Sequence, residues 1–261
     1  MPESDDPRER RSPFLFWAFG WYLRWLFWRK FNAIRIARDG LPVVPAGRPL
    51  IICTNHPSWW DPAFFILLQT LLFPGRPGYG PMDAVALGKY GLLAKMGVFG
   101  IALDSRAGAA RFLAASGRIL SDPANVLWIT AQGTFSDTRT RPIRLRPGIA
   151  HLLRRVPGAT VLPLAMEYPF WNEAKPEALA RFGTPIPATR DRTVAEWTAL
   201  LEAELTRTAD ALAADSVLRD ARRFDRVMQG SAAIGPMYSL YRRIRSLLTG
   251  QAIDVSHGGR E

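Results

Sequence analysis

The sequence predicts an α/β protein, a mixed β-sheet layered with helices. Short apolar runs bounded by turn residues are typical of buried strands, and longer segments with helical periodicity alternate with them. A chain of 261 residues, 48% hydrophobic and 22% charged, is long enough for one full core. The expected strands cover residues 48–54, 84–88, 125–131 and 160–166, and the expected helices between them cover 61–73, 107–120 and 147–156.

Three parts are expected along the chain: an N-terminal tail with a helix (1–34), a central domain (35–190) and a helical extension (191–261). In the last run of the extension, apolar residues recur at helical spacing and arginines fall elsewhere. This run is therefore expected to be a basic amphipathic helix that either docks on the central domain or lies on a membrane. The helices expected in the extension are 194–214, 217–228 and a run from Pro236 to Leu248.

The N-terminal helix is the most aromatic part of the chain: residues 13–31 read PFLFWAFGWYLRWLFWRKF. Arg24 interrupts it well before the roughly 20 apolar residues that a membrane span requires, and a mixed-charge start argues against a signal peptide. Tryptophans beside basic residues suit the bilayer interface. We expect a helix in the membrane plane, with ordinary packing in the core as the alternative. This predicts a membrane-associated protein on the cytoplasmic face, for example of a bacterial inner membrane.

The charge and cysteine content narrow the function further. A net charge of +11 and a pI near 10.6 favour polyanionic partners. A nucleic-acid-binding protein is not favoured, because no helix-turn-helix, zinc-finger or RNA-binding aromatic motif is present. One cysteine and three scattered histidines predict neither a disulfide framework nor a metal centre. An anionic membrane surface is the expected partner.

The segment Asn55-His56-Pro57-Ser58-Trp59-Trp60-Asp61 follows an apolar strand. Pro57 can open a helix, which would place Asp61 about one turn inside it. Within an unbroken helix, a five-residue separation would splay the two side chains by about 140°. His56 must therefore precede the helix and fold back over its first turn. Asp61 would then accept a hydrogen bond from the N–H of one imidazole nitrogen and leave the other nitrogen as a base for a hydroxyl acceptor.

Two covalent mechanisms have less support. No G-x-S-x-G motif occurs in the chain, so a serine hydrolase is not favoured. Cys53 lies three residues before His56, but an apolar cysteine at a strand end more often packs than reacts. Direct attack by the acceptor is the simpler mechanism.

This N-H-x4-D motif resembles that of the glycerolipid acyltransferases related to 1-acylglycerol-3-phosphate acyltransferase. Other blocks resemble theirs in the same order, over about residues 48–166. Residues 97–106 (GVFGIALDSR) are similar to the second block, in which Arg106 would contact the acceptor's phosphate. Residues 132–136 (QGTFS) are similar to the third, usually E-G-T-R, and residues 161–164 (VLPL) to the fourth, whose proline shapes the acyl or acceptor site. Residues 146–148 resemble the family's basic-x-Gly step.

The resemblance implies an O-acyltransferase that needs no cofactor. It would move an acyl chain from acyl-CoA or acyl-carrier protein to a hydroxyl of a lipid such as lysophosphatidate or another lysophospholipid. The central domain would be catalytic, with His56 and Asp61 as its catalytic pair. Backbone amides near Gly133 are candidates to stabilise the oxyanion. The substrate-binding residues would be Arg106, Gln132, Gly133, Thr134 and Pro163, and Trp59, Trp60, Phe64 and Phe65 would line an acyl channel or pack in the core.

The third block departs from the family pattern. Gln132 stands in place of the carboxylate, and Phe135 in place of the arginine. Phenylalanine cannot make the charge-assisted, often bidentate contact that arginine makes with phosphate. Either Arg139, Arg141 or Arg144 substitutes for it, or the acceptor carries no phosphomonoester, as with a lysophospholipid diester, an aminolipid or a glycosylated terpenoid. A non-catalytic membrane scaffold is a further alternative.

Overall fold

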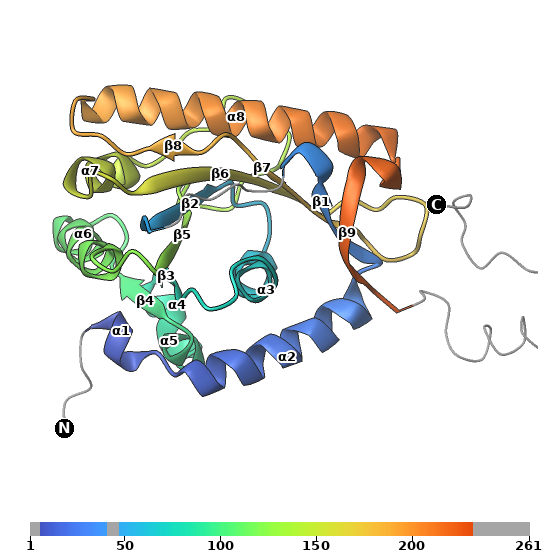
Figure 1. Ribbon diagram of the computed structural model, residues 1–261, viewed down its shortest axis with the longest axis horizontal. Helices are drawn as coiled ribbons and strands as arrows, with labels where there is room; N and C mark the ends of the chain where they lie inside the picture. The colour runs from blue at the N-terminus through green and yellow to red at the C-terminus, as the bar shows by residue number, and fades with distance from the viewer. Residues whose placement is uncertain (1–5, 41–46, 232–261) are drawn as a thin grey trace, which may run out of the picture.

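The computed structural model describes residues 6–40 and 47–231 and confirms the predicted fold class (Figure 1). In this part of the chain the strands form one nine-stranded mixed sheet in the order β4-β3-β5-β2-β6-β7-β1-β9, with β8 paired to β6. The strands are β1 Ala33–Ala37, β2 Leu50–Thr54, β3 Gly78–Asp83, β4 Val98–Ile101, β5 Val126–Thr130, β6 Thr160–Glu167, β7 Ala178–Phe182, β8 Ile186–Pro187 and β9 Phe224–Gln229.

The centre of the sheet is parallel, from β4 through β3, β5 and β2 to β6. β2 lies between β5 and β6, with Cys53 opposite Ile129 on one side and Pro163 on the other. β7 and β9 pair antiparallel with their neighbours β6 and β1. Because parallel strands share a direction, the carboxyl ends of β2, β4, β5 and β6 meet at one edge of the sheet.

Helices cover both faces of the sheet. α8 lies along β6 and β7 on the face that α6 and α7 share, and α3 covers the other face with α2 outside it (Figure 1). Side chains of β2 alternate between the two cores: Ile51 and Cys53 enter one, and Leu50 and Ile52 the other. The helices are α1 Pro7–Arg10, α2 Pro13–Lys30, α3 Asp61–Leu72, α4 Ala84–Lys89, α5 Leu92–Lys95, α6 Arg106–Leu120, α7 Gly148–Arg155 and α8 Val194–Leu218, with short 3-10 helices η1 Arg38–Gly40 and η2 Ala221–Arg223.

Three of the four predicted strands and four predicted helices are confirmed by β2, β5 and β6 and by α3, α6, α7 and α8. The strand predicted at residues 84–88 is wrong, because this run is helix α4. Asp83 ends β3 and accepts a hydrogen bond from the Ala86 amide, so it caps the new helix. A short apolar run does not distinguish a strand from a buried helical turn.

The helix predicted at residues 217–228 is also wrong. α8 continues to Leu218 and ends at Arg219, whose φ of 51° is left-handed. Asp220 then caps η2, and the chain returns as β9 along β1, with Phe224 buried. Tertiary pairing with β1 thus overrides the local helical pattern. The run from Pro236 to Leu248 lies outside the described residues.

The aromatic segment forms α2, with Ser12 as its N-cap and Pro13 in its first turn. One side of α2 is packed: Leu23 and Phe27 are buried, and Gly20 lies so close to α3 that a Cβ there would be 3.1 Å from a Thr70 methyl group. The other side is exposed. No helix among residues 6–40 and 47–231 is long and apolar enough to span a bilayer.

Candidate active site

The predicted site residues come from loops at the carboxyl edge of the sheet. His56 follows β2, Gln132 and Gly133 follow β5, and Arg106 begins the helix after β4. In open α/β sheets this edge is where ligands bind. Three residues of the predicted substrate-binding set do not line the cavity described below: Gln132, Thr134, which is exposed, and Pro163, which is inside β6.

His56 and Asp61 contact each other in the geometry that the spacing requires. His56 Nδ1 lies 2.7 Å from Asp61 Oδ2. His56 folds back from the loop, as expected, but α3 begins at Asp61 and not at Pro57. Asp61 accepts a hydrogen bond from the Ser58 amide, and a carboxylate at a helix N-terminus is favoured by the helix dipole. With Nδ1 engaged, Nε2 is left for a substrate.

Asp61 is fully buried, at 0% exposure, whereas the His56 side chain is 16% exposed. Burial raises the pKa of the Asp61 carboxyl, and hydrogen bonds from His56, from the Ser58 amide and from the Tyr168 hydroxyl oppose this shift. The Tyr168 hydroxyl lies 2.8 Å from Asp61 Oδ1. The carboxylate is thus surrounded by donors that favour its charged form.

The turn after β5 holds His56 from three directions. The His56 amide donates to Gln132 Oε1 at 2.9 Å, and the Ser136 amide donates to the His56 carbonyl at 2.9 Å. The Phe135 ring lies 4.3 Å from the imidazole, centroid to centroid, and Phe135 is 62% exposed. The side-chain oxygen of Gln132, which we expected to bind substrate, is thus bonded to the backbone of His56.

Asn55 fastens the same loop to β6. Its side-chain amide donates to the Met166 carbonyl at 3.0 Å, and its side-chain oxygen accepts from the Met166 amide at 2.9 Å. The asparagine of the N-H-x4-D motif therefore joins the ends of β2 and β6, which fixes the start of the loop that carries His56.

The Gly133 amide is not available for an oxyanion, because it donates to the Thr130 carbonyl at 3.0 Å. Gly133 has a φ of 71°, and a Cβ there would lie 2.4 Å from Arg146 Nε. The residue must be glycine both for its left-handed backbone and for the close approach of this arginine.

Two arginines line the cavity beside His56. Arg106 is exposed at the start of α6, and Arg146 packs on Gly133 and forms an ion pair of 2.7 Å with Asp104. The sequence pattern alone did not single out Arg146 as a residue of the site, although this arginine stands directly before Pro147-Gly148 in the step that resembles a family block. The three arginines proposed as substitutes do not line the cavity: Arg139, Arg141 and Arg144 pair instead with Asp137, Asp210 and Glu202.

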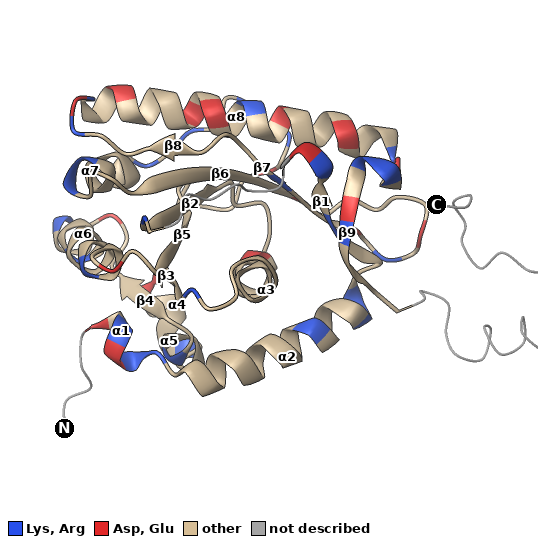
Figure 2. Ribbon diagram, viewed as in Figure 1, with Lys and Arg blue, Asp and Glu red and all other residues tan. Residues whose placement is uncertain are grey.

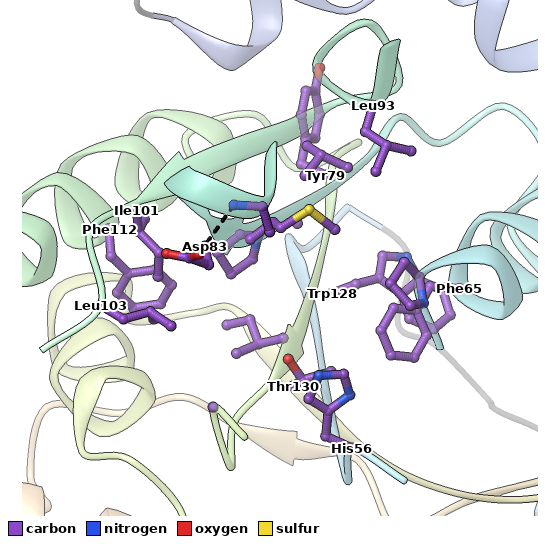
Figure 3. Close-up of a pocket in the computed structure, with 18 of the residues that line it drawn as sticks. His56, Phe65, Tyr79, Asp83, Leu93, Ile101, Leu103, Phe112, Trp128 and Thr130 are labelled. Carbon is purple, nitrogen blue, oxygen red and sulfur yellow. Dashed lines mark hydrogen bonds between the residues drawn. The ribbon is translucent and has the colours of Figure 1, made fainter. Parts of the chain in front are cut away.

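An apolar cavity of about 1450 Å³ reaches His56 and extends between α2, α3, α4 and the edge strands (Figure 3). Its volume exceeds the roughly 300–1,000 Å³ of ordinary small-molecule sites. Of the four aromatic residues considered for a channel, Trp59 and Phe65 line it. Trp60 and Phe64 instead pack against Phe27 of α2. Other lining residues include Phe16, Phe19, Leu23, Ile66, Tyr79, Leu93 and Trp128.

Cys53 is buried inside β2, and burial raises the pKa of its thiol to about 12. A thiol with such a pKa holds almost no thiolate at neutral pH, so it is a poor nucleophile. The packing interpretation of Cys53 agrees with its place in the core.

The mixed sheet layered with helices is a fold shared with a solved acyltransferase. Among solved structures the chain is similar to the crystal structure of the 1-acyl-sn-glycerophosphate (LPA) acyltransferase PlsC from Thermotoga maritima. The TM-score is 0.55 and the identity 13%, and the match covers 82% of this chain and 84% of that chain. No protein-family model and no curated protein sequence matches the chain. The likeness therefore establishes the fold, and function is argued from the site.

Proposed function

We propose that this protein is an O-acyltransferase that moves an acyl chain from a thioester to a hydroxyl of a lipid acceptor. The observation that carries the proposal is the 2.7 Å contact between His56 Nδ1 and Asp61 Oδ2 beside a large apolar cavity. A base held by a buried carboxylate provides proton transfer, and the cavity provides space for a lipid chain.

The reaction follows from this arrangement. His56 Nε2 takes the proton of the acceptor hydroxyl while its oxygen attacks the thioester carbonyl. Asp61 stabilises the resulting imidazolium. The tetrahedral intermediate then collapses, the C–S bond breaks, and the leaving thiolate takes the proton from His56. No enzyme nucleophile is required, which agrees with the buried Cys53.

The donor in this proposal is acyl-CoA or acyl-carrier protein. Both carry the acyl chain on a thioester, and both are polyanionic. The positive net charge of +11 favours their approach.

The test is acyl transfer by purified protein, read by mass spectrometry. His56→Ala and Asp61→Asn should each lose activity by at least about a thousandfold while keeping their circular dichroism spectra. The first variant lacks the base that transfers the proton, and the second lacks the carboxylate that stabilises the imidazolium. Asp210→Asn is the matched control, since this carboxylate is exposed and pairs with Arg141 away from the cavity. Full turnover in His56→Ala would remove the proposal.

For the acceptor, we propose a lysophospholipid such as lysophosphatidate, whose headgroup would lie near Arg106 and Arg146. One observation favours a second candidate: Phe135 covers the face of His56 with an apolar ring. This suits an acceptor without a phosphomonoester, such as an aminolipid or a glycosylated terpenoid. Rates with lysophosphatidate and with neutral and zwitterionic hydroxyl lipids, measured in parallel, distinguish the two.

We also propose that α2 docks on the anionic, cytoplasmic surface of a membrane. Five of its exposed aromatic residues form a stripe along it. Basic residues gather toward its C-terminal end (Figure 2). Exposed apolar side chains of α4, of α5 and of the turn between them also line the neighbouring cavity; they include Val85, Leu92 and Tyr90. Indole and guanidinium groups together suit the headgroup region. The stripe consists of Phe14, Trp17, Trp21, Trp25 and Trp28.

Vesicle co-sedimentation tests the docking. The triple substitution of Trp17, Trp21 and Trp25 by serine should weaken binding to anionic vesicles at least tenfold, because each indole loses its buried apolar area. The control replaces Val217 and Leu218, which are exposed at the C-terminal end of α8, by serine. Equal binding by wild type and the triple variant would contradict the proposal.

A further inference from the structure

Tyr168 contacts the candidate catalytic carboxylate from a distant part of the chain. It directly follows β6, outside every motif described above, and its hydroxyl donates to Asp61 Oδ1 at 2.8 Å. The other oxygen, Oδ2, forms hydrogen bonds with His56 Nδ1 and with the Ser58 amide. Among residues 6–40 and 47–231, Tyr168 is the hydrogen-bond donor to Oδ1.

The tyrosine is held firmly in this position. Its ring packs edge-on against Phe64 of α3, with centroids 5.8 Å apart, and lies 5.9 Å from Phe31 at the end of α2. Two residues earlier, the backbone amide and carbonyl of Met166 both form hydrogen bonds with the Asn55 side chain. The end of β6 therefore places Tyr168 in fixed register with the loop that carries His56.

The hydroxyl remains a donor at neutral pH. Burial and the neighbouring Asp61 carboxylate raise the pKa of Tyr168 well above its usual value. A phenol that stays protonated can always donate to a carboxylate, and a hydrogen bond to a charged acceptor is stronger than one between neutral groups.

Asp61 needs this support because burial disfavours the charged form of its carboxyl and raises its pKa. The ionisable groups that face it are His56, from the loop after β2, and Tyr168, from the segment after β6. The aromatic rings of Phe31, Trp60 and Phe64 also pack around Tyr168 and the start of α3. Without the hydroxyl, Oδ1 would face apolar rings, and the protonated carboxyl would be favoured.

We propose that Tyr168 is a positioning residue for the dyad: it keeps Asp61 ionised and oriented so that His56 can act as a base. The inference rests on the acyl transfer proposed above. The contacts form a chain from Tyr168 through Asp61 to His56, and the outer end of that chain is fixed by packing against α2 and α3.

Tyr168→Phe tests this role, because it removes the hydroxyl and keeps the ring. We expect kcat to fall about tenfold with KM for both substrates unchanged. The acid limb of kcat/KM should move up by about one pH unit, since Asp61 takes up a proton more readily. Trp171→Phe, which removes a buried N–H from the same segment, is the control and should leave the acid limb in place.

A second variant shifts the profile in the opposite direction. 3-Fluorotyrosine at position 168 is a stronger donor, so the acid limb should move to lower pH, which a purely structural role for the ring would not produce. Unchanged kcat and an unchanged acid limb in Tyr168→Phe, with His56→Ala inactive, would overturn the role of Tyr168. Full activity in His56→Ala would overturn the proposed function instead.

Discussion

Phe135→Arg introduces the arginine of the E-G-T-R block that residues 132–135 resemble. Phe135 is 62% exposed, and its ring lies 4.3 Å from the imidazole of His56. An arginine built there begins on the exposed side of the turn, beside the candidate base. If the acceptor's headgroup lies at this turn, the guanidinium can reach a phosphomonoester.

The expected magnitude has two parts. Losing the ring contact costs about 0.5–1.5 kcal/mol, which lowers kcat/KM about 2- to 10-fold for every acceptor. A charge-assisted contact with phosphate contributes about 1.5–3 kcal/mol, but only for a phosphomonoester. The ratio of kcat/KM for lysophosphatidate to that for a neutral monoacylglycerol should therefore rise roughly 10- to 100-fold.

The assay measures both acceptors with one donor, at equal lipid packing and fixed salt, because screening weakens exposed charge contacts. Phe135→Leu is the control: it loses the ring without gaining a charge, so both rates fall together and the ratio stays constant. A folded, active Phe135→Arg protein with the wild-type ratio would refute the reasoning, because it would place the acceptor's headgroup away from this turn.

Three further outcomes follow from the same contacts. Gln132→Met should lose about 1–3 kcal/mol of unfolding free energy and most activity, because the His56 amide loses its hydrogen-bond acceptor. Gln132→Glu keeps an acceptor oxygen and should keep both stability and activity. Urea denaturation measures the first quantity and turnover the second. Cys53→Ala should retain turnover, and iodoacetamide should label wild-type protein only after unfolding, since the thiol pKa is about 12; rapid labelling of native protein would contradict this. Gly133→Ala should lower the melting temperature and displace Arg146, because a Cβ would lie 2.4 Å from its Nε; an unchanged melting temperature would count against that geometry.

Local chemistry made the candidate dyad predictable. An apolar strand, a proline and a helix start within a dozen residues constrain His56 and Asp61 whatever the rest of the chain does. The same locality explains the correct central strands, which are continuously apolar because both faces are buried. It also explains the errors: Ala84–Lys89 is too short for periodicity to classify, and Phe224–Gln229 becomes a strand only because β1 lies beside it.

The partners of the dyad could not be predicted, because they are distant in sequence. Gln132 and Tyr168 reach the site across 76 and 107 residues. Nothing in a glutamine after one strand, or a tyrosine after another, indicates that both will contact the same loop. The arginines show the same limit, since Arg144 and Arg146 are alike in sequence and only the fold directs one to Glu202 and the other into the cavity.

α2 has two apolar sides that face different surroundings. Its inner side places Phe27 against Trp60 and Phe64, and Phe31, just beyond its last turn, packs against Tyr168. Its outer side exposes a row of indoles. To reduce this exposed apolar surface for crystallisation or solution NMR, replacing the outer row with polar residues is therefore better than truncating the helix. Removing the helix would take away the rings that pack against Trp60, Phe64 and Tyr168 beside Asp61. The outer side of α2 can therefore be changed to alter the surface while the inner side keeps the site intact.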